Sequence, residues 1–206
     1  YFLSRLRVNK QHIMLMLVML PMWMNFLLRT YAWMSILENN GFINGFFRSI
    51  GLISFLQTHF GYTLDYIPLI NTQGAIVLGM VYNFLPFMVL PIYNVLVKID
   101  KDVISAARDL GAGNIQTFTK IILPLSVPGI ISGITMVFVP ALTTFVISNL
   151  LGGSKILLIG NVIEQEFQQG SNWHVGSGLS LVLMIFIIAS MALIAKYDKD
   201  GEGTAF

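Results

Sequence analysis

Long runs of apolar residues, separated by short polar stretches, dominate this sequence. A helix that crosses a membrane needs about 20 mainly apolar residues, and four segments of the chain meet that requirement. The predicted spans cover residues 13–37, 74–97, 125–151 and 175–195. Prolines lie inside the first three, and neighbouring helices in a membrane can accommodate the kinks that prolines cause. The pattern therefore predicts an all-α integral membrane protein, a polytopic bundle of transmembrane helices.

Composition supports this class of protein. Of the 206 residues, 55% are hydrophobic and 11% are charged, and the mean hydropathy is +0.75. Soluble domains carry roughly a quarter charged residues. The net charge of +2 gives no reason to expect a nucleic-acid partner, and the absence of cysteine excludes disulfides and thiolate metal sites.

The distribution of lysine and arginine predicts the orientation in the membrane. Nine of these residues precede the first span, follow the last or lie between the second and third spans. That side is expected to be the cytoplasm. The opposite side keeps only Arg48 and Lys155. Arg29 lies within the first span, where a charged residue is either functional or structural. We favour the structural interpretation, in which Arg29 reaches the outer interface or pairs with Glu38 or a carbonyl group.

Two external segments follow from this orientation. Within residues 38–73 the apolar-rich stretch 42–62 is too polar to span, so we expect an interfacial helix or a lid. Residues 152–174 predict a short re-entrant or surface helix that carries Glu164 and Glu166.

The loop between the second and third spans, residues 98–124, is polar but regular. Asp102 is placed to cap a helix over 103–110, which Gly111 would break. Asn114 is expected to cap a second short helix.

That second helix should carry one apolar stripe of Ile115, Phe118 and Ile122. Pro124 should mark its end. An apolar helix face outside the membrane generally needs a protein partner.

The spacing in this loop resembles the signature of ABC importer permeases, which reads Glu-Ala-Ala, three residues, Gly, nine residues, Ile-x-Leu-Pro. Six of the seven specified positions match, and the exception is Ser105 in place of Glu. The matching residues are Ala106, Ala107, Gly111, Ile121, Leu123 and Pro124.

Four segments, residues 23–33, 82–100, 106–112 and 150–167, resemble the spermidine/putrescine importer permeases, and the similarity extends over nearly the whole chain. The resemblance implies a single permease domain over residues 1–206 with the type I ABC importer permease fold, in the bacterial cytoplasmic membrane. The first one or two helices of that fold are expected to be absent here. The implied partners are an ATP-binding subunit dimer, a second permease subunit, an extracytoplasmic polyamine-binding protein, the polyamine substrate and the lipid bilayer.

The resemblance also implies that the loop couples transport to the partner ATPase. The residues expected at that contact are Ser105, Ala106, Ala107, Asp109, Gly111, Ala112, Phe118, Leu123 and Pro124. The chain lacks a GxxxxGK[ST] phosphate loop. We therefore expect no enzyme activity, no catalytic residue, no metal and no cofactor on this chain, with ATP and Mg²⁺ bound by the ATPase.

A cationic substrate favours carboxylates and aromatic faces along its path. The candidates are Trp23, Tyr31, Trp33, Tyr82, Asn83, Tyr93, Glu164 and Glu166. Each has an ordinary alternative, because Trp and Tyr also form interfacial belts and acids also lie on solvated loops.

Three alternatives remain open from the sequence. The chain could serve an ABC importer of another small solute, such as another organic cation, phosphate, sulfate or iron. An ion-coupled secondary transporter would require paired carboxylates or half-helix ion sites within the membrane, and the predicted spans contain no Asp or Glu. A purely structural membrane subunit would leave the loop signature without a role.

Overall fold

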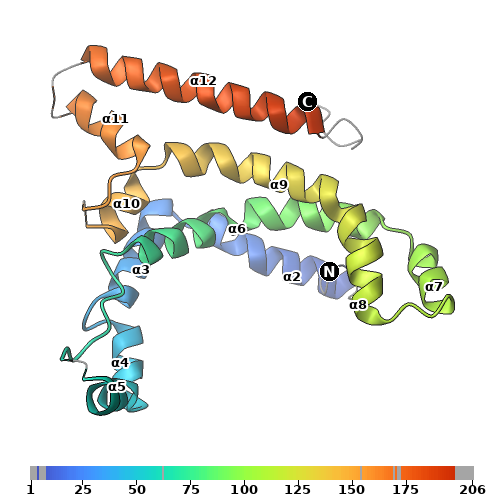
Figure 1. The fold of residues 1–206 in the computed structure, drawn as a ribbon, viewed down its shortest axis with the longest axis horizontal. Helices are drawn as coiled ribbons and strands as arrows, with labels where there is room; N and C mark the ends of the chain where they lie inside the picture. The colour runs from blue at the N-terminus through green and yellow to red at the C-terminus, as the bar shows by residue number, and fades with distance from the viewer. Residues whose placement is uncertain are drawn as a thin grey trace. The chain divides into compact units, whose positions relative to one another are not determined.

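The computed structural model describes residues 4, 8–61, 63–153, 155–168, 170 and 173–197, and this part of the chain contains helices and loops but no strand (Figure 1). The helical elements are α2 (Val8–Met19), η1 (Leu20–Trp23), α3 (Phe26–Leu37), α4 (Phe42–Ser49), α5 (Leu52–Phe60), α6 (Gln73–Lys98), α7 (Lys101–Asp109), α8 (Asn114–Thr117), η2 (Phe118–Ile122), α9 (Leu123–Thr143), α10 (Val146–Leu151), α11 (Ile159–Gln168) and α12 (Trp173–Tyr197).

Contacts divide the chain into two compact units. Unit 1 takes its described residues from Tyr1–Leu20, Phe84–Ala141 and Leu181–Phe206, and unit 2 from Pro21–Asn83 and Leu142–Ser180. The long helices α6, α9 and α12 each contribute residues to both units.

Three helices of the described chain are long and apolar enough to cross a membrane, and an interrupted helix pair would make a fourth. The three are Gln73–Lys98, Asn114–Thr143 and Trp173–Lys196. The second and fourth apolar segments of the sequence thus form the expected helices within about two residues at each end.

The first predicted span is wrong as one continuous helix. Pro21 lies in the 3₁₀ turn η1, and α3 begins only at Phe26. Asn25 caps α3, because its side-chain oxygen accepts a hydrogen bond of 2.8 Å from the backbone N–H of Leu27. Apolar side chains continue through this break, so hydropathy alone could not reveal it.

The third predicted span is also wrong at its outer end. The helix ends at Thr143, and residues 146–151 form the separate helix α10. Ile147 and Leu151 of α10 are completely buried within unit 2. These two apolar side chains therefore belong to a packed core rather than to the end of a span.

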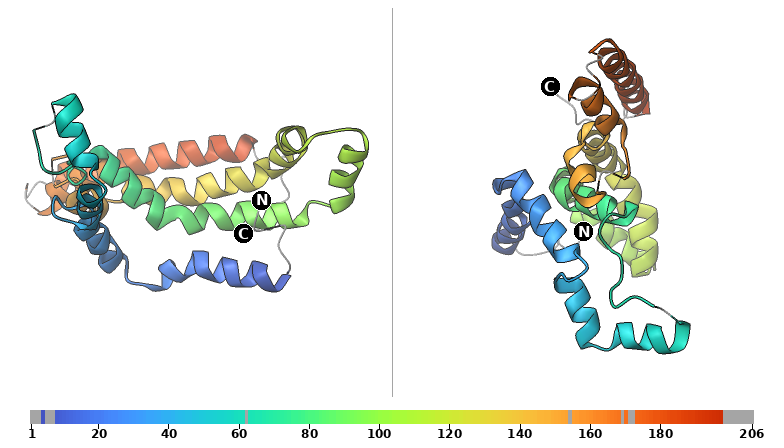
Figure 2. Two further views of the ribbon diagram at one scale, coloured as in Figure 1. Left: turned by 90° about the horizontal axis from the view of Figure 1, so that it is seen from below. Right: turned by 90° about the vertical axis from the view of Figure 1, so that its left-hand side faces the viewer.

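Glycines bring α9 close to α6 within unit 1, and the two helices run side by side there (Figure 2). A Cβ on Gly129 would lie 2.9 Å from the carbonyl oxygen of Pro91, and one on Gly133 would lie 3.2 Å from that of Met88. GxxxG pairs permit such backbone approach between membrane helices. This pair therefore packs against a helix of the same chain.

Unit 2 is built around α10. A Cβ on Gly79 of α6 would collide with Leu151 and lie 3.1 Å from Cγ2 of Ile147. Helix α3 packs against α10 as well. The segments expected to lie outside the membrane form the helices α4, α5 and α11.

Candidate functional site

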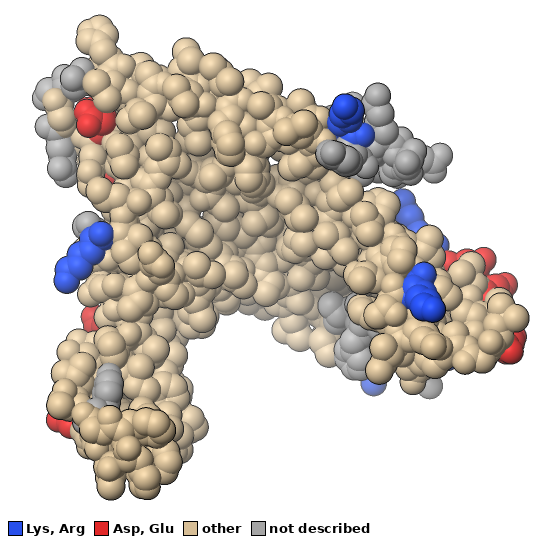
Figure 3. Space-filling model, in the orientation of Figure 1, with Lys and Arg blue, Asp and Glu red and all other residues tan. Residues whose placement is uncertain are grey.

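The helix–turn–helix at residues 98–124 forms the first candidate site, at the end of α6 and the start of α9 (Figure 2). Figure 3 shows acidic and basic side chains gathered over α7 and α8, whereas the surface over the long helices of unit 1 carries few charges. The first helix of the loop, α7, begins at Lys101, two residues before the helix that the sequence predicts. Asp100 is the N-cap, since its side chain accepts a hydrogen bond of 2.9 Å from the backbone N–H of Asp102.

Gly111 makes the turn between the two loop helices. Its φ is +85°, in the left-handed region that favours glycine. The N–H of Gly111 donates to the carbonyl of Arg108, and the N–H of Ala112 donates to that of Ala107. This pair of hydrogen bonds is the Schellman motif that ends many helices. The sharp reversal expected at Gly111 is therefore observed.

The second loop helix is not a separate element. Gly113, rather than Asn114, is its N-cap, and Gln116 Oε1 accepts a hydrogen bond of 3.2 Å from the Gly113 N–H. From Asn114 the chain continues as one helix to Thr143. The prediction that Pro124 ends the helix is therefore wrong.

A π-helical turn, η2, allows the helix to continue past Pro124. The N–H of Leu123 donates to the carbonyl of Phe118, five residues back. A π turn accommodates an additional residue and so rotates the following side chains by about 100° relative to a straight α-helix. Consequently the predicted apolar stripe is split, since Ile115 is 81% exposed while Ile122 is 2% exposed.

The two loop helices enclose a small pocket of about 260 Å³ lined by Arg108, Asn114, Thr117, Phe118 and Ile122. A side-chain hydrogen bond of 3.4 Å from Arg108 Nη2 to Asn114 Oδ1 connects α7 to the start of α8. This bond joins the two loop helices beside the pocket.

The residues expected at the ATPase contact divide by exposure. Ala107 is buried together with Ile104, so both pack within unit 1. Ala112 is half-buried. The exposed ones are Ser105, Ala106, Asp109, Gly111, Phe118, Leu123 and Pro124. The Ser105 hydroxyl donates to the carbonyl of Lys101 at 3.1 Å, within its own helix.

Two aromatic candidates for the substrate path lie together in unit 2. The rings of Trp33 and Tyr82 meet edge to face with their centroids 5.3 Å apart. Next to Tyr82, Asn83 is buried, and its Nδ2 donates to the Gly79 carbonyl at 2.9 Å. The Oδ1 of Asn83 has no hydrogen-bond partner within the described ranges.

The other path candidates are more dispersed. Trp23 and Tyr31 are exposed, and Glu166 is half-buried. Glu164 accepts a hydrogen bond of 3.4 Å from Asn149. Tyr93 belongs to unit 1, where its hydroxyl donates to Gln11 at 3.2 Å.

Arg29 is buried more deeply than the sequence indicated. It is 9% exposed, and its Nε and Nη1 have no hydrogen-bond partner among the described residues. The expected pairing with Glu38 or a carbonyl is therefore not observed.

A buried amide network in unit 2 could not be found from the sequence. Asn161 donates to the Phe145 carbonyl at 3.1 Å and to Asn149 Oδ1 at 2.7 Å, and it accepts from the Leu158 N–H at 3.0 Å. The Ser148 hydroxyl also donates to it. Nothing in the local pattern around Asn161 distinguishes it from a surface asparagine.

The long apolar helices of the described chain define a multi-pass α-helical membrane protein. The chain belongs to the family of binding-protein-dependent transport system inner membrane components, which matches residues 10–197. The predicted fold class and the resemblance to importer permeases are both confirmed.

Several relatives show where within the family the chain falls. The spermidine/putrescine transport system permease protein PotB of Haemophilus influenzae is 39% identical over 199 residues, which are 97% of this chain and 66% of that protein. PotB of Escherichia coli K12 is also 39% identical, over 94% of this chain and 66% of its own length. The E. coli inner membrane ABC transporter permease protein YdcU is 31% identical, over 87% of this chain and 57% of its own length. The chain thus spans just under two thirds of the PotB relatives.

A solved structure shares the fold. One chain of a bacterial ABC transporter that imports the acidic polysaccharide alginate superposes with a TM-score of 0.75 and 14% identity, over 98% of this chain and 70% of that chain. At this identity the similarity describes the architecture alone.

Proposed function

We propose that this chain is the transmembrane permease subunit of an ATP-driven ABC importer that moves polyamines into the cytoplasm. The observation that carries the proposal is the 39% identity to the spermidine/putrescine permease protein of H. influenzae over 97% of the chain. A shared architecture would not suffice, because the same fold serves a transporter of an acidic polysaccharide.

The helix–turn–helix at residues 98–124 is the proposed coupling site. Its exposed side chains on α7, together with Gly111 and Phe118, form the surface that would contact an ATP-binding subunit. ATP and Mg²⁺ belong to a dimer of that subunit, so this chain contributes no catalytic residue. Closure of the dimer would move the loop, and α8 would transmit the movement into α9.

The remaining partners are a second permease subunit, an extracytoplasmic polyamine-binding protein and the lipid bilayer. Residues 1–206 form one transmembrane domain in this proposal. Trp33 and Tyr82 are the path candidates with the best support, since their rings are in contact and aromatic. Asn83, the next residue on α6, has a buried carbonyl oxygen without a partner among the described residues. Aromatic faces attract ammonium groups through cation–π contacts.

Uptake measurements test the substrate class. Cells without polyamine import of their own receive the protein with its partner subunits, and uptake of radiolabelled spermidine is followed. Unlabelled putrescine should compete, whereas phosphate, sulfate and iron should not. The matched control omits this chain and should abolish uptake. Competition by an unrelated solute, or absence of spermidine uptake, would contradict the polyamine assignment.

A further inference from the structure

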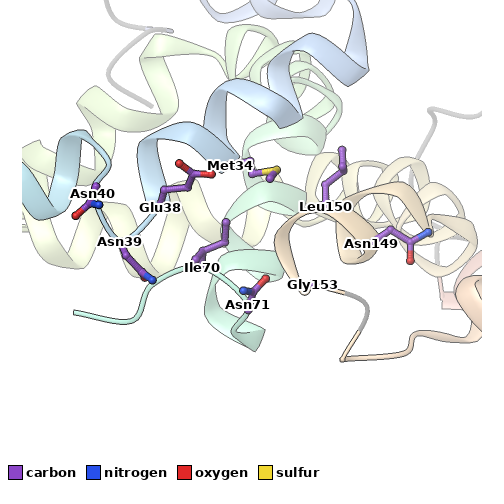
Figure 4. A pocket seen from close by; sticks show the side chains of 9 residues that line it. All are labelled: Met34, Glu38, Asn39, Asn40, Ile70, Asn71, Asn149, Leu150 and Gly153. Carbon is purple, nitrogen blue, oxygen red and sulfur yellow. The ribbon is translucent and has the colours of Figure 1, made fainter. Parts of the chain in front are cut away.

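A pocket of about 460 Å³ lies in unit 2. None of the path candidates lines it, although its lining residue Asn149 donates a hydrogen bond to Glu164. It is formed where α3 and α10 end and where the chain approaches α6 (Figure 4). The lining residues are Met34, Glu38, Asn39, Asn40, Ile70, Asn71, Asn149, Leu150 and Gly153.

The lining combines one carboxylate with four amides and three apolar side chains. No lysine or arginine of the described chain lines the pocket. The Glu38 carboxylate is exposed and forms no ion pair or side-chain hydrogen bond with the described residues. Two of the four amide oxygens already accept hydrogen bonds, Asn40 Oδ1 from Arg48 and Asn149 Oδ1 from Asn161. The carboxylate of Glu38 is therefore the main acceptor on this wall, and a carboxylate attracts a cation that can donate hydrogen bonds.

Arg48 bonds one of the lining residues of the pocket, Asn40, and already has acceptors. Arg48 donates from Nη2 to Asn40 Oδ1 at 3.2 Å and from Nε to the Asp65 carbonyl at 2.9 Å. Arg48 does not pair with Glu38, so the Glu38 carboxylate is free of this guanidinium group.

Buried hydrogen bonds hold the Glu38 side of the pocket in place. The Glu38 backbone carbonyl accepts from the Gly41 N–H at 2.8 Å and from Asn44 Nδ2 at 3.2 Å. Asn44 is completely buried and also bonds both backbone groups of Ile67. The carboxylate therefore projects from a rigid backbone, which reduces the entropy cost of binding.

The opposite side is equally fixed. The Asn71 N–H donates to the Leu151 carbonyl at 2.8 Å, although Asn71 has a φ of +61°. A Cβ on Gly153 would overlap the Asn71 amide, so the two residues are in close contact.

We propose that this pocket binds one end of a polyamine. The ammonium group lies at the Glu38 carboxylate, and the methylene chain lies over Met34, Ile70 and Leu150. This inference rests on the proposed function, and in the predicted orientation the pocket opens on the outer side. It would act as a loading site before substrate enters the path between the helices.

Cysteine protection tests the pocket directly, because the chain contains no cysteine. Asn39 is exposed and lines the pocket, so an Asn39→Cys variant places a thiol at the rim. The complete transporter in detergent is labelled with a neutral maleimide, with and without spermidine. A Thr63→Cys variant gives the matched control, since Thr63 is exposed and does not line the pocket.

Spermidine should slow labelling of the Asn39→Cys variant several-fold and leave the Thr63→Cys variant unchanged. Adding Glu38→Gln should raise the spermidine concentration needed for half protection about five- to tenfold, because a charge-assisted hydrogen bond is lost. Glu38→Asp should restore most of the protection.

The inference would be overturned if labelling of Asn39→Cys were equal with and without spermidine. It would also be overturned if Glu38→Gln left the spermidine concentration for half protection unchanged. The uptake experiment separates this failure from that of the proposed function. Uptake of spermidine without protection at Asn39→Cys would retain the importer and reject the pocket. Protection without uptake would retain the cation site and reject the importer.

Discussion

At the scale of single residues, buried amides contribute to this protein in a way that hydropathy does not register. Asn161 and Asn44 are both completely buried, and each connects segments that are distant in sequence. A buried amide is stable only when its hydrogen bonds are made. These two side chains therefore determine how the loops around α10 and α4 are held.

Replacing Asn161 by Ala should destabilise unit 2 strongly. The change removes the hydrogen bonds that the Leu158 N–H and Asn149 Oδ1 make to Asn161, at a cost of about 2–4 kcal/mol in total. The Phe145 carbonyl keeps its hydrogen bond from the Asn149 N–H. Thermal unfolding of the purified protein in detergent measures the effect. Asn39→Ala is the control, because Asn39 is exposed, and it should leave the melting temperature unchanged. Equal melting temperatures for both variants would contradict the role of the network.

Exposure also separates two neighbouring alanines of the coupling loop. Ala106 is exposed and Ala107 is buried, so only the first can belong to a docking surface without moving the loop. A large or charged side chain at Ala107 would disturb α7 itself. The sequence signature treats both positions alike, and only the structure tells them apart.

An Ala106→Trp variant should therefore release the ATP-binding subunit while α7 stays folded. We expect the amount of ATPase that copurifies to fall about tenfold, since a bulky side chain at a packed contact costs about 1–3 kcal/mol. Thr63→Trp serves as the control, because Thr63 is exposed and lies outside the loop at residues 98–124. Undiminished copurification with Ala106→Trp would argue against docking at this surface.

At the scale of elements, α4 buries its asparagine and exposes two of its phenylalanines. Asn44 is buried and Arg48 is bonded to the loop, whereas Phe42 is 78% exposed and Phe46 is also exposed. Such a helix would be poorly suited to water. It fits the membrane interface that the sequence predicts for this segment, where an apolar face contacts the acyl chains.

Spin labels can test this placement in the cysteine-free chain. A label at Phe46→Cys should be accessible to oxygen, which concentrates in lipid, and protected from a water-soluble nickel complex. A label at Ser54→Cys, exposed on α5, should show the reverse preference. A Phe46→Cys label that is accessible to the nickel complex and little affected by oxygen would place α4 in water.

Helix existence follows from hydropathy, but helix boundaries depend on caps and tertiary packing. The segment 74–97 is continuous in the structure, while 13–37 is interrupted at Asn25. The Asn25 amide accepts a hydrogen bond from the backbone, and Pro21 has no backbone N–H to donate. A mean hydropathy over a window of residues does not register either effect. Likewise 125–151 reads as one apolar run, although its last six residues form the core helix α10.

At the scale of the whole molecule, a short loop signature was enough to predict the family and the fold. The same sequence could not predict the geometry of the candidate sites. Ala106, Ala107 and Gly111 identify the family because their spacing is specific. The pocket at Glu38 depends on backbone segments far apart in the sequence, including the turn at Asn71. No periodicity along the chain could bring those segments together.

The division of labour between subunits gives a further prediction. The chain purified alone in detergent should hydrolyse no ATP, because it lacks a phosphate-binding loop. Release of phosphate from ATP measures this, and adding the ATP-binding subunit should restore activity in the same assay. Hydrolysis by the chain alone would contradict its role as a permease subunit.

The π turn at Phe118–Ile122 places two apolar patterns of different phase on one uninterrupted helix. In the proposed complex, side chains before the turn face the cytoplasmic partner, and side chains after it face neighbouring helices. Substitutions on one side of the turn need not disturb the face presented on the other. The docking surface and the packing of the span can therefore diverge independently between relatives, even though a single helix carries both.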